Sequence, residues 1–397
     1  MSDPIYFDHN ATTPVDPRVV QSMLPYFSDQ FGNAASSTHA FGWEAGKALD
    51  DARKRVALCL GAQKPEQIIF TSGATEANNM LIKGLFFAKD DEPFHIVTQE
   101  TEHSCVIKSI EFLKGLGAEV TVLPVDQEGF INLDDLKKSL KPHTKLVSIM
   151  WGNNEIGTLQ AIQEIGDIVR NHSDALFHCD AVQAVSRVAI DLKNLPIDCL
   201  SFSAHKFYGP KGVGAMYLSE RFFKTRWQPL LHGGGQEFGL RSTTVNIPGV
   251  IGMAKALELA QEDWQSEVAR LSHLRNHLID RVLNEIPHAL LNGSRDKRLC
   301  HNASFCIPYT ESGLLLLAMP QIACSSGSAC ASGKTEPSRV ALAIGRSPEE
   351  ARATIRFGLG KSNTKEQVDF AVECLKEACL KERKKSLAYE MLQQKKS

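Results

Sequence analysis

No stretch of this 397-residue sequence is apolar for long enough to cross a membrane. The longest candidate, LLLLAM at 314–319, falls far short of the roughly 20 residues that a spanning helix needs. The N-terminus, MSDPIYFDHN, lacks a basic and apolar leader, so we expect no secretory signal. The net charge is only −2, which gives no reason to expect nucleic acid or an anionic membrane as the main partner. These absences predict a cytoplasmic protein.

The sequence also has no C-x-x-C pair among its ten cysteines. In a long chain without a leader, we expect reduced thiols, most of them acting as small buried hydrophobic residues. The spacing of Cys324 and Cys330 fits no common zinc pattern, and no metal site is expected. At most one or two thiols are needed for chemistry.

Short β-rich runs alternate with helical patterns between about residues 60 and 220. The runs that predict strands are QIIFTS (67–72), HIVTQ (95–99), EVTVLPV (119–125), KLVSIMW (145–151), ALFHCD (175–180), CLSFSA (199–204) and VGAMYL (213–218). The patterns that predict crossover helices or helix starts cover 75–87, 103–117, 161–172 and 181–190. This alternation predicts an α/β fold with a mainly parallel sheet, helices on both faces, and ligands at the carboxyl ends of the strands.

A second, smaller α+β domain is predicted after one long helical pattern at 253–286. It has strand-like segments at 303–309 and 353–360, a Ser/Gly/Ala loop near 325–335, and a charged final helix at 365–394. The basic KERKK of that helix is expected to be a solvated face. We place the large domain at 16–255 and the small domain at 1–15 together with 256–397.

A lysine stands where a predicted buried strand ends, in SFSAHKFYGP at 201–210. Burial disfavours the ammonium of Lys206 and makes its free amine a better nucleophile. Such an amine forms a Schiff base with a carbonyl compound, and pyridoxal phosphate (PLP) is the commonest cofactor of that kind. Alone, this pattern is more typical of a surface lysine at a turn, so the other requirements of PLP decide the matter.

A phosphate needs backbone N–H groups at the start of a helix. The segment IIFTSGATEANNM supplies a strand, a turn at Gly73 and a helix start, where the amides of Ala74 and Thr75 can face a phosphate. An ordinary strand-to-helix cap has the same pattern. Ser203 and His205 flank Lys206 and offer further phosphate donors.

The pyridine nitrogen of PLP needs a carboxylate, and the ring needs a planar partner. Asp180 ends a predicted strand, although aspartate in that place is often a helix N-cap. Gln183 follows on the next turn and can donate to the ring hydroxyl. His103, just after another strand, can stack on the ring.

The whole set of motifs resembles the cysteine desulfurases, the NifS/IscS-like group of the class V aminotransferase family and of fold type I PLP enzymes. The resemblance extends from YFDHNATTPVDPRV to IRFGLG near residue 360. It rests on FTSGATEANN, TEHSCV, VSIMWGNNEIGT, HCDAVQAV, SFSAHKFYGPKGVGA, HGGGQEFGLRSTT and SSGSACASGKTEPS, in this order. The sequence departs from the common pattern at His9, Ala34 and Ala204, none of which is a chemical group of the site.

The resemblance implies a role for each matching residue. Lys206 is the Schiff-base lysine, Asp180 pairs with the pyridine nitrogen, Gln183 with the ring oxygen, and His103 stacks on the ring. Thr75, Ser203 and His205 hold the phosphate together with Ala74. Thr244, or else Thr243, reaches the phosphate of a neighbouring subunit, which implies a homodimer. Asn154 lies at the cofactor and, with Arg356, holds the substrate carboxylate, and Asn33 lies at the mouth of the same site.

The resemblance further implies that Cys330 attacks the sulfur of L-cysteine, so that L-alanine leaves and a persulfide stays on the enzyme for transfer to an acceptor protein. The surrounding loop, rich in Ser, Gly and Ala, buries little and suits a thiol that serves both steps. Alone, Cys330 reads as an idle loop cysteine. The acceptor stays open among an iron–sulfur scaffold, a tRNA-thiolation relay and a DNA phosphorothioation partner, because the chain ends at SLAYEMLQQKKS, before the extension with which some members dock theirs.

Two other readings remain at this point. The first is a selenocysteine lyase or another aminotransferase-like PLP enzyme in which Cys330 is incidental. The second is a non-catalytic scaffold or partner subunit with the same fold. The joint presence of Lys206, Asp180, His103 and Cys330 argues against a decayed site.

Overall fold

The computed structural model describes residues 4–89, 92–327 and 337–394. Its largest sheet has the strand order β2-β8-β7-β6-β5-β3-β4. β8 is antiparallel to both of its neighbours, and the other neighbouring pairs are parallel. The strands are β2 (Ile68–Thr71), β3 (His95–Gln99), β4 (Glu119–Leu123), β5 (Thr144–Ser148), β6 (Leu176–Asp180), β7 (Cys199–Ser203) and β8 (Gly214–Leu218). Each coincides with one predicted run, and the mainly parallel seven-stranded α/β sheet is confirmed.

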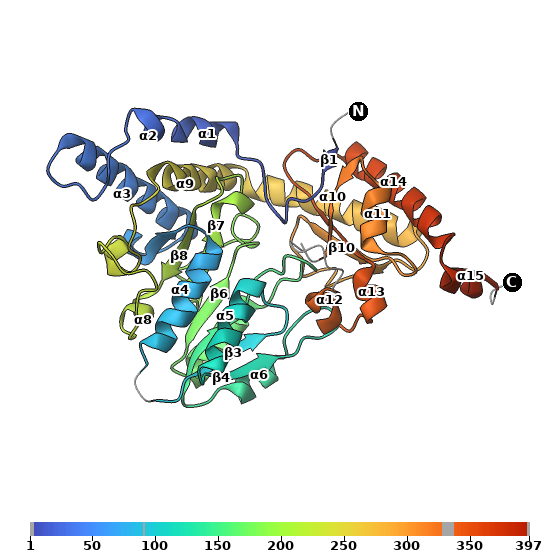
Figure 1. Cartoon of the computed structure of the whole chain (residues 1–397), viewed down its shortest axis with the longest axis horizontal. Helices are drawn as coiled ribbons and strands as arrows, with labels where there is room; N and C mark the ends of the chain where they lie inside the picture. The colour runs from blue at the N-terminus through green and yellow to red at the C-terminus, as the bar shows by residue number, and fades with distance from the viewer. Residues whose placement is uncertain (1–3, 90–91, 328–336, 395–397) are drawn as a thin grey trace.

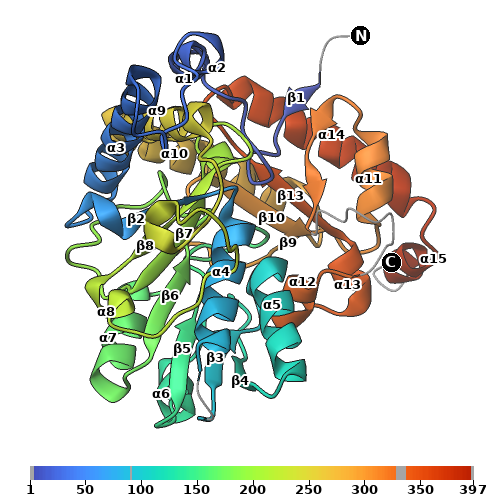
Figure 2. The same cartoon turned by 60° about the vertical axis from the view of Figure 1, so that its left-hand side comes forward.

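Helices cover both faces of this sheet because its central strands are buried on both faces. In β2, Ile68 and Phe70 pack into one core and Ile69 into the other. The first core includes α1 (Pro17–Met23), α3 (Ala40–Leu60), α6 (Leu133–Ser139), α7 (Ile162–His172) and α9 (Ile247–Glu262). The second includes α4 (Ala74–Phe87), α5 (Ser104–Gly115) and α8 (Glu220–Phe223). Figures 1 and 2 show α4 and α5 side by side over the sheet.

A smaller, antiparallel sheet has its own core and lies at the other end of the molecule (Figure 1). Its order is β12 (Ser325–Ser326), β13 (Thr354–Gly358), β10 (Asn302–Cys306) and β9 (Leu290–Leu291). Its core includes α10 (Trp264–Glu285), α11 (Ser312–Ala318) and α14 (Lys365–Arg383). Near the N-terminus, β1 (Ile5–Tyr6) pairs with β11 (Ile322–Ala323), and Phe7 enters the same core.

The remaining helical segments are short. They are α2 (Pro25–Ser28), η1 (Pro65–Gln67), η2 (Ala204–Lys206), η3 (Glu237–Gly239), α12 (Arg339–Ala343), α13 (Pro348–Arg352) and α15 (Leu387–Gln394). The predicted division of the chain at residue 255 stays a prediction. In the structure, the residue between the last helix on the large sheet and the first helix on the small sheet is Asp263.

Two predicted long helices are each divided. The pattern at 253–286 is broken at Asp263, whose backbone leaves helical geometry at φ −118° and ψ 19°. The pattern at 365–394 is broken between α14 and α15. The solvated face predicted for KERKK is wrong for two of its residues, since Glu382 and Arg383 are buried. The guanidinium of Arg383 donates two hydrogen bonds to the carbonyl of Pro308 and lies over the ring of Tyr389.

The helix predicted at 181–190 is also wrong. The segment forms consecutive turns, in which Val185 donates to the carbonyl of Ala181 and Val188 to that of Ala184. Ser186 has φ of 68°, in the left-handed region, and this conformation stops a helix from continuing. The apolar residues at helical spacing here pack the turns against the core, and they do not form a helix.

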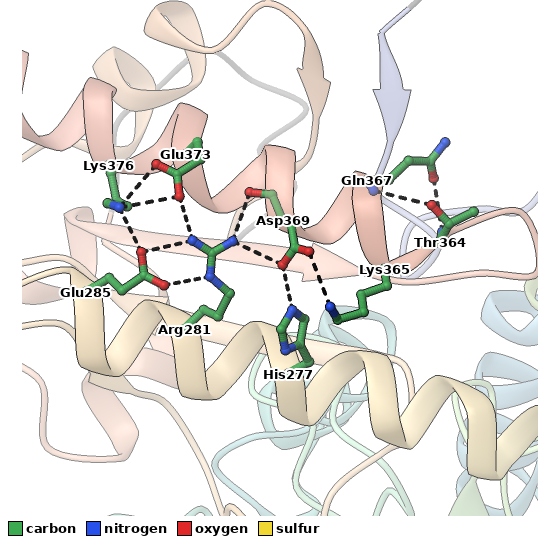
Figure 3. Close-up of polar contacts among 9 residues, drawn as sticks. All are labelled: His277, Arg281, Glu285, Thr364, Lys365, Gln367, Asp369, Glu373 and Lys376. Atoms are coloured by element: carbon green, nitrogen blue, oxygen red, sulfur yellow. Dashed lines mark hydrogen bonds and ion pairs between the residues drawn. The ribbon is translucent and has the colours of Figure 1, made fainter.

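Ion pairs join α10 to α14 across the outer surface of the small sheet's core (Figure 3). Arg281 is shared by Glu285 on its own helix and by Asp369 and Glu373 on the other. His277 and Lys365 also contact Asp369, and Lys376 contacts both glutamates. Networks of this kind hold more firmly than isolated surface pairs, so they help to fix the two helices in register.

Nine cysteines are described, and none of these is in a disulfide. No helix within the described ranges has the length and apolar character of a membrane span. Over the same ranges, the side chains of His, Cys, Asp and Glu form no group of three or more that could hold a metal ion.

Candidate active site

A cavity of about 550 Å³ lies at the carboxyl ends of β2, β6 and β7. This is the position where open α/β sheets bind ligands. The structure brings many of the predicted site residues together around it: Ala74, Thr75, His103, Asn154, Asp180, Gln183, Ser203, His205 and Lys206. These residues come from five separate segments of the chain, and the fold makes them neighbours.

Lys206 ends a short helical turn directly after β7, and its amine is buried. Its Nζ donates to the backbone carbonyls of Asn10 at 2.6 Å and Ala11 at 2.7 Å. Burial, with the nearby charge of Arg356, lowers the pKa of Lys206 to about 8, against smaller opposing effects of Asp8 and Asp180. A substantial fraction of this amine is therefore unprotonated, and nucleophilic, slightly above neutral pH.

Asp180 is held rigidly at the end of β6. Its Oδ2 accepts a hydrogen bond from the side chain of Asn78 at 2.9 Å, and its Oδ1 accepts one from the backbone of Val182 at 3.1 Å. Asn78 is itself fixed, because its Oδ1 accepts from Ser201 at 2.5 Å. The carboxylate can thus face a ligand nitrogen without losing its orientation. Asn78 was not among the predicted residues, although it lies in the quoted motif FTSGATEANN.

Gln183 lines the cavity and belongs to a buried cluster of side-chain amides. Its Oε1 accepts from Asn10 at 3.1 Å, and its Nε2 donates to the carbonyl of Asn10 at 2.9 Å. The ring of His301 contacts both side chains, through Nε2. Sequence reasoning missed Asn10 and His301; Asn10 lies in the DHNATTP motif, but His301 carries no local signal.

The start of α4 forms the anion-binding end of the cavity. The helix begins at Ala74, and its first-turn N–H groups have no partner within the helix. Gly214 brings the neighbouring strand very close, since a Cβ there would lie 2.5 Å from Cα of Gly73. Thr75 and Ser203 add hydroxyl groups, and Lys211, which was not predicted, adds a positive charge.

His205 lies at the same end of the cavity, and its own imidazole is neutral. Burial lowers its pKa to about 4, with help from Lys206 and Lys211. Its Nδ1 is 3.1 Å from Oγ1 of Thr12. The other ring nitrogen is therefore the one left for a ligand.

His103 caps α5 and presents its ring at the cavity wall. Its Nδ1 accepts from the backbone of Cys105 at 3.2 Å and lies 3.0 Å from the thiol of that residue. Cys105 also lines the cavity, which sequence reasoning missed. Burial and the nearby Asp180 raise the pKa of Cys105 to about 12, so this thiol is protonated and a poor nucleophile. Glu102, the preceding neighbour of His103, has its pKa raised to about 8 by burial and by Asp180.

Arg356 does not line the cavity itself but lies directly behind Asn154, which does. It is buried on β13 and donates to the carbonyl of Asn154 at 2.9 Å. Its Nη2 donates to Asp8 and to Ser325, both at 2.7 Å, while its buried Nε has no partner among the described residues. The guanidinium thus keeps capacity for one more acceptor.

Two further predicted residues, Thr244 and Asn33, do not line this cavity, and a third falls outside the described residues. Thr244 is exposed, three residues after Arg241, which is bound to Glu76 at the start of α4. Asn33 is exposed, and its side chain accepts from the backbone of Ala35 at 3.0 Å. Cys330 lies outside the described residues.

The donor set fits PLP. A buried amine with a lowered pKa faces the same cavity as a fixed carboxylate, and a helix N-terminus with hydroxyl groups lies at one end. These are the three groups that an aldehyde, a pyridine nitrogen and a phosphate require.

Comparison with known proteins agrees with this reading. Residues 5–370 match the family described as aminotransferase class-V. The chain is 45% identical over 389 residues to cysteine desulfurase IscS of Methylobacillus flagellatus, with 98% of this chain and 95% of that protein covered. It is 44% identical over 392 residues to the cysteine desulfurase of Homo sapiens, with 98% and 85% covered. A solved structure of a NifS-like protein, 36% identical, superposes with a TM-score of 0.87 and covers 94% of this chain and 98% of that chain.

These matches cover both sheets, so the fold is that of the type I PLP enzymes, and the family to which they point is PLP-dependent. The predicted resemblance is confirmed over almost the whole chain. The chain belongs to the class-V aminotransferase family and, within it, to the cysteine desulfurases.

Proposed function

We propose that this chain converts L-cysteine into L-alanine with PLP, holds the sulfur as a persulfide on Cys330 and passes it to an acceptor protein. The observation that carries the proposal is the buried Lys206 amine in one cavity with Asp180 and the start of α4. The similarity to proteins named cysteine desulfurase supports the choice of substrate.

The residues that would hold the cofactor follow from their positions. The amides of Ala74 and Thr75 and the hydroxyls of Thr75 and Ser203, with His205, would hold the phosphate. Asp180 would keep a proton on the ring nitrogen, and Gln183 would donate to the ring oxygen. His103 is assigned to the face of the ring. PLP, when bound, supplies an electron sink for the carbon skeleton of an amino acid.

Lys206 would act first as a nucleophile and then as a base. Its lowered pKa provides the free amine for attachment of the cofactor. Once the substrate's amine has displaced it, the same Nζ can take the proton from Cα of the substrate. The carbonyls of Asn10 and Ala11 are within hydrogen-bond distance of Nζ and would hold the resulting ammonium. His103, which lines the cavity, would give or take a proton at the substrate.

Asn154 and Arg356 would hold the carboxylate of the substrate. The amide lines the cavity, and the guanidinium behind it has an Nε without a partner among the described residues. Arginine suits this role because its planar fork binds a carboxylate through two hydrogen bonds. Asn33 is assigned to the mouth of the site of an assembled enzyme.

The sulfur step needs a second nucleophile, which we assign to Cys330. Its thiolate Sγ forms a bond to the sulfur of the substrate while the Cβ–S bond of the substrate breaks. The electron pair of that bond stays on Cβ, which takes a proton to become the methyl group of alanine, and Lys206 returns a proton to Cα. The enzyme keeps the sulfur as a persulfide, whose outer sulfur the acceptor then takes.

A homodimer would complete the site. Thr244 and Asn33 are exposed and away from the cavity of their own chain. Around α2 and the start of α3, four aromatic side chains are strongly exposed: Phe27 (63%), Phe31 (63%), Phe41 (51%) and Trp43 (61%). Exposed apolar patches of this size mark interaction surfaces. A second copy seated there would cover the patch and supply Thr244 to the phosphate.

The acceptor is proposed to be a protein of iron–sulfur cluster or thio-cofactor synthesis. Relatives at similar identity are named as bacterial IscS, mitochondrial and mitosomal cysteine desulfurases. We therefore propose a cytoplasmic location, with the mitochondrion and the mitosome as the alternatives that the names of these relatives give. Fractionation of the cells that make the protein would decide between them.

The test is incubation of the purified PLP-loaded protein with L-cysteine and a reductant, with alanine and sulfide measured together. Equal amounts of the two products support the proposal. Pyruvate or a keto acid in place of alanine would favour lyase or transaminase chemistry, and turnover of selenocysteine alone would favour a selenocysteine lyase. Absence of any product would favour a partner subunit without catalysis.

A further inference from the structure

The turn after β5 places two adjacent residues in different surroundings. Asn154 lines the cavity, whereas the carboxyl of Glu155 points to the small sheet. The turn is rigid, because Oδ1 of Asn153 accepts from the backbone of Glu155 at 2.8 Å and of Ile156 at 2.9 Å. The side chain of Asn302, on β10, donates to the carbonyl of Glu155 at 3.3 Å. A shift of Glu155 would thus be felt at the cavity wall.

The carboxyl of Glu155 lies near both described ends of the segment that contains Cys330. On the C-terminal side, Oγ of Ser338 donates to Oε2 of Glu155 at 2.5 Å. On the N-terminal side, a Cβ built on Gly327 would lie 3.4 Å from the same Oε2. One oxygen atom is therefore bonded to Ser338 and lies near Gly327, and the undescribed residues 328–336 fall between these two.

Both ends have further contacts that make these positions definite. Ser338 is buried and caps α12, since its Oγ accepts from the backbone of Ala341 at 3.1 Å. Arg339 donates to the backbone carbonyl of Glu102, next to His103. Gly327 donates to the carbonyl of Thr354 on β13 at 3.4 Å. Glu155 joins the Ser338 end to the turn that carries Asn154.

The groups around the carboxyl of Glu155 indicate a structural role for it and not exposure to solvent. Burial raises its pKa, against the opposing effects of the Ser338 hydrogen bond, Arg356 and Arg339. The catalytic assignments leave this group unused, since it lines no part of the cavity.

We propose that Glu155 is a positioning residue for sulfur transfer: through Ser338 it fixes the C-terminal end of the segment containing Cys330 relative to the cavity wall at Asn154. The proposal rests on the proposed function, in which Cys330 takes the sulfur. Its consequence is specific. Loss of the carboxyl should slow attack on the substrate sulfur without changing how PLP or cysteine is held.

The test compares Glu155→Ala, Glu155→Gln and the control Glu128→Ala, an exposed glutamate of a neighbouring loop whose side chain makes none of these contacts. Four quantities are measured: PLP content, the dissociation constant for cysteine, the single-turnover rate of persulfide formation on Cys330 by mass spectrometry, and the rate of Cys330 alkylation in the PLP-free protein.

In Glu155→Ala we expect persulfide formation to slow about tenfold or more, which corresponds to the loss of one hydrogen bond to a charged group. PLP content and cysteine affinity should stay within about twofold of wild type, and the alkylation rate should change. Glu155→Gln should recover most of the rate, because its side-chain oxygen still accepts from Ser338. Adding Ser338→Ala to Glu155→Ala should cause little further loss.

Wild-type persulfide formation and alkylation in Glu155→Ala would overturn the proposal. So would an equal loss of PLP or cysteine binding, which would indicate general damage to the turn, or an equal loss in Glu155→Gln. If the wild-type protein itself forms no persulfide on Cys330, the proposed function fails instead. The alkylation rates then still report whether Glu155 sets the position of that thiol.

Discussion

Asp8 and Arg356 form an ion pair of 2.7 Å at the back of the cavity that contains Lys206. The guanidinium is 2% exposed and the carboxylate 22%. Asp8 therefore occupies one side of the group to which we assign the substrate carboxylate. Binding of cysteine and pairing with Asp8 compete for the same positive charge.

This competition predicts opposite effects of two substitutions on the KM for cysteine. Asp8→Asn removes the competing charge but keeps the size of the side chain, and we expect KM to fall a few-fold with little change in kcat. Arg356→Lys loses the planar fork, and we expect KM to rise about tenfold or more. Steady-state kinetics across cysteine concentration measures both. Equal KM values in all three proteins would remove Arg356 from the carboxylate site.

Lys206 should reduce the stability of the PLP-free protein at neutral pH. Its pKa is about 8 in the folded protein and near 10.5 when exposed, so between these values the unfolded chain binds more protons. Stability from this group therefore rises as pH increases from 8 to 10.5 and is lowest below 8. We expect PLP-free Lys206→Met to be more stable than wild type at pH 7, and the difference to shrink by pH 10.

Urea denaturation at the two pH values measures this difference. Lys211→Met, at an exposed lysine that lines the same cavity, serves as the control for removal of a charge there. A wild-type protein as stable as Lys206→Met at pH 7 would contradict the lowered pKa.

In the loaded enzyme, borohydride should attach the cofactor to the peptide SFSAHK and to no other.

Substitutions at two cysteines distinguish the sulfur step from general thiol reactivity. Cys330→Ser should keep PLP and cysteine binding but lose sulfide release by orders of magnitude, because a serine oxygen is a poor nucleophile toward sulfur. Cys324→Ser should keep normal turnover, since burial raises the pKa of Cys324 to about 12 and leaves it protonated. Mass spectrometry after cysteine treatment without reductant should find the extra sulfur on the Cys330 peptide. Extra sulfur on Cys324, or full activity of Cys330→Ser, would refute the assignment.

A buried ion pair holds the loop before Thr244 to the sheet. Arg53 on α3 and Glu237 lie 2.6 Å apart and are almost fully buried, and Glu237 also accepts from the backbone of Phe70 on β2 at 2.7 Å. Glu237→Ala would leave a buried, unpaired guanidinium, so we expect the free energy of unfolding to fall by about 3 kcal/mol or more. The exposed pair of Lys64 and Glu220 is the control, and Glu220→Ala should change little. Similar losses in the two variants would contradict the argument from burial.

The seven strands were predictable because each is a short apolar run whose period and length differ from those of a helix. The turns at 181–190 were not, since only the backbone at Ser186 reveals that the helical pattern stops there. The break at Asp263 depends on which core each flanking helix joins, and sequence periodicity does not encode this. Arg383 was misread because its charge is satisfied by a distant carbonyl, that of Pro308.

The site was predictable where a motif carries the residue. Lys206, Asp180 and Thr75 lie at strand ends or helix starts, and their neighbours in sequence are also their neighbours in space. His301 lacks such a signal, because it directly precedes β10 of the small sheet. Lys211 lies in the quoted motif SFSAHKFYGPKGVGA but follows a turn, and nothing in the motif marks it as facing the cavity. Thr244 and Asn33 fall outside the cavity of one chain, so a single sequence cannot indicate where they act.

The N-terminal segment that holds Lys206 is completed by residues between 301 and 358, which come much later in the chain. Asn10 contacts His301, β1 pairs with β11, and the backbone of Gly358 bonds with Phe7 and His9. On the ribosome, where the N-terminal part emerges first, the large sheet can therefore fold while residues 5–11 still lack their partners. The carbonyls that receive the lysine amine take their places only after residue 358 has emerged. We therefore expect loading of the cofactor to be a late event, so that a ribosome-bound chain stalled before that residue should bind PLP weakly even with its whole large sheet formed.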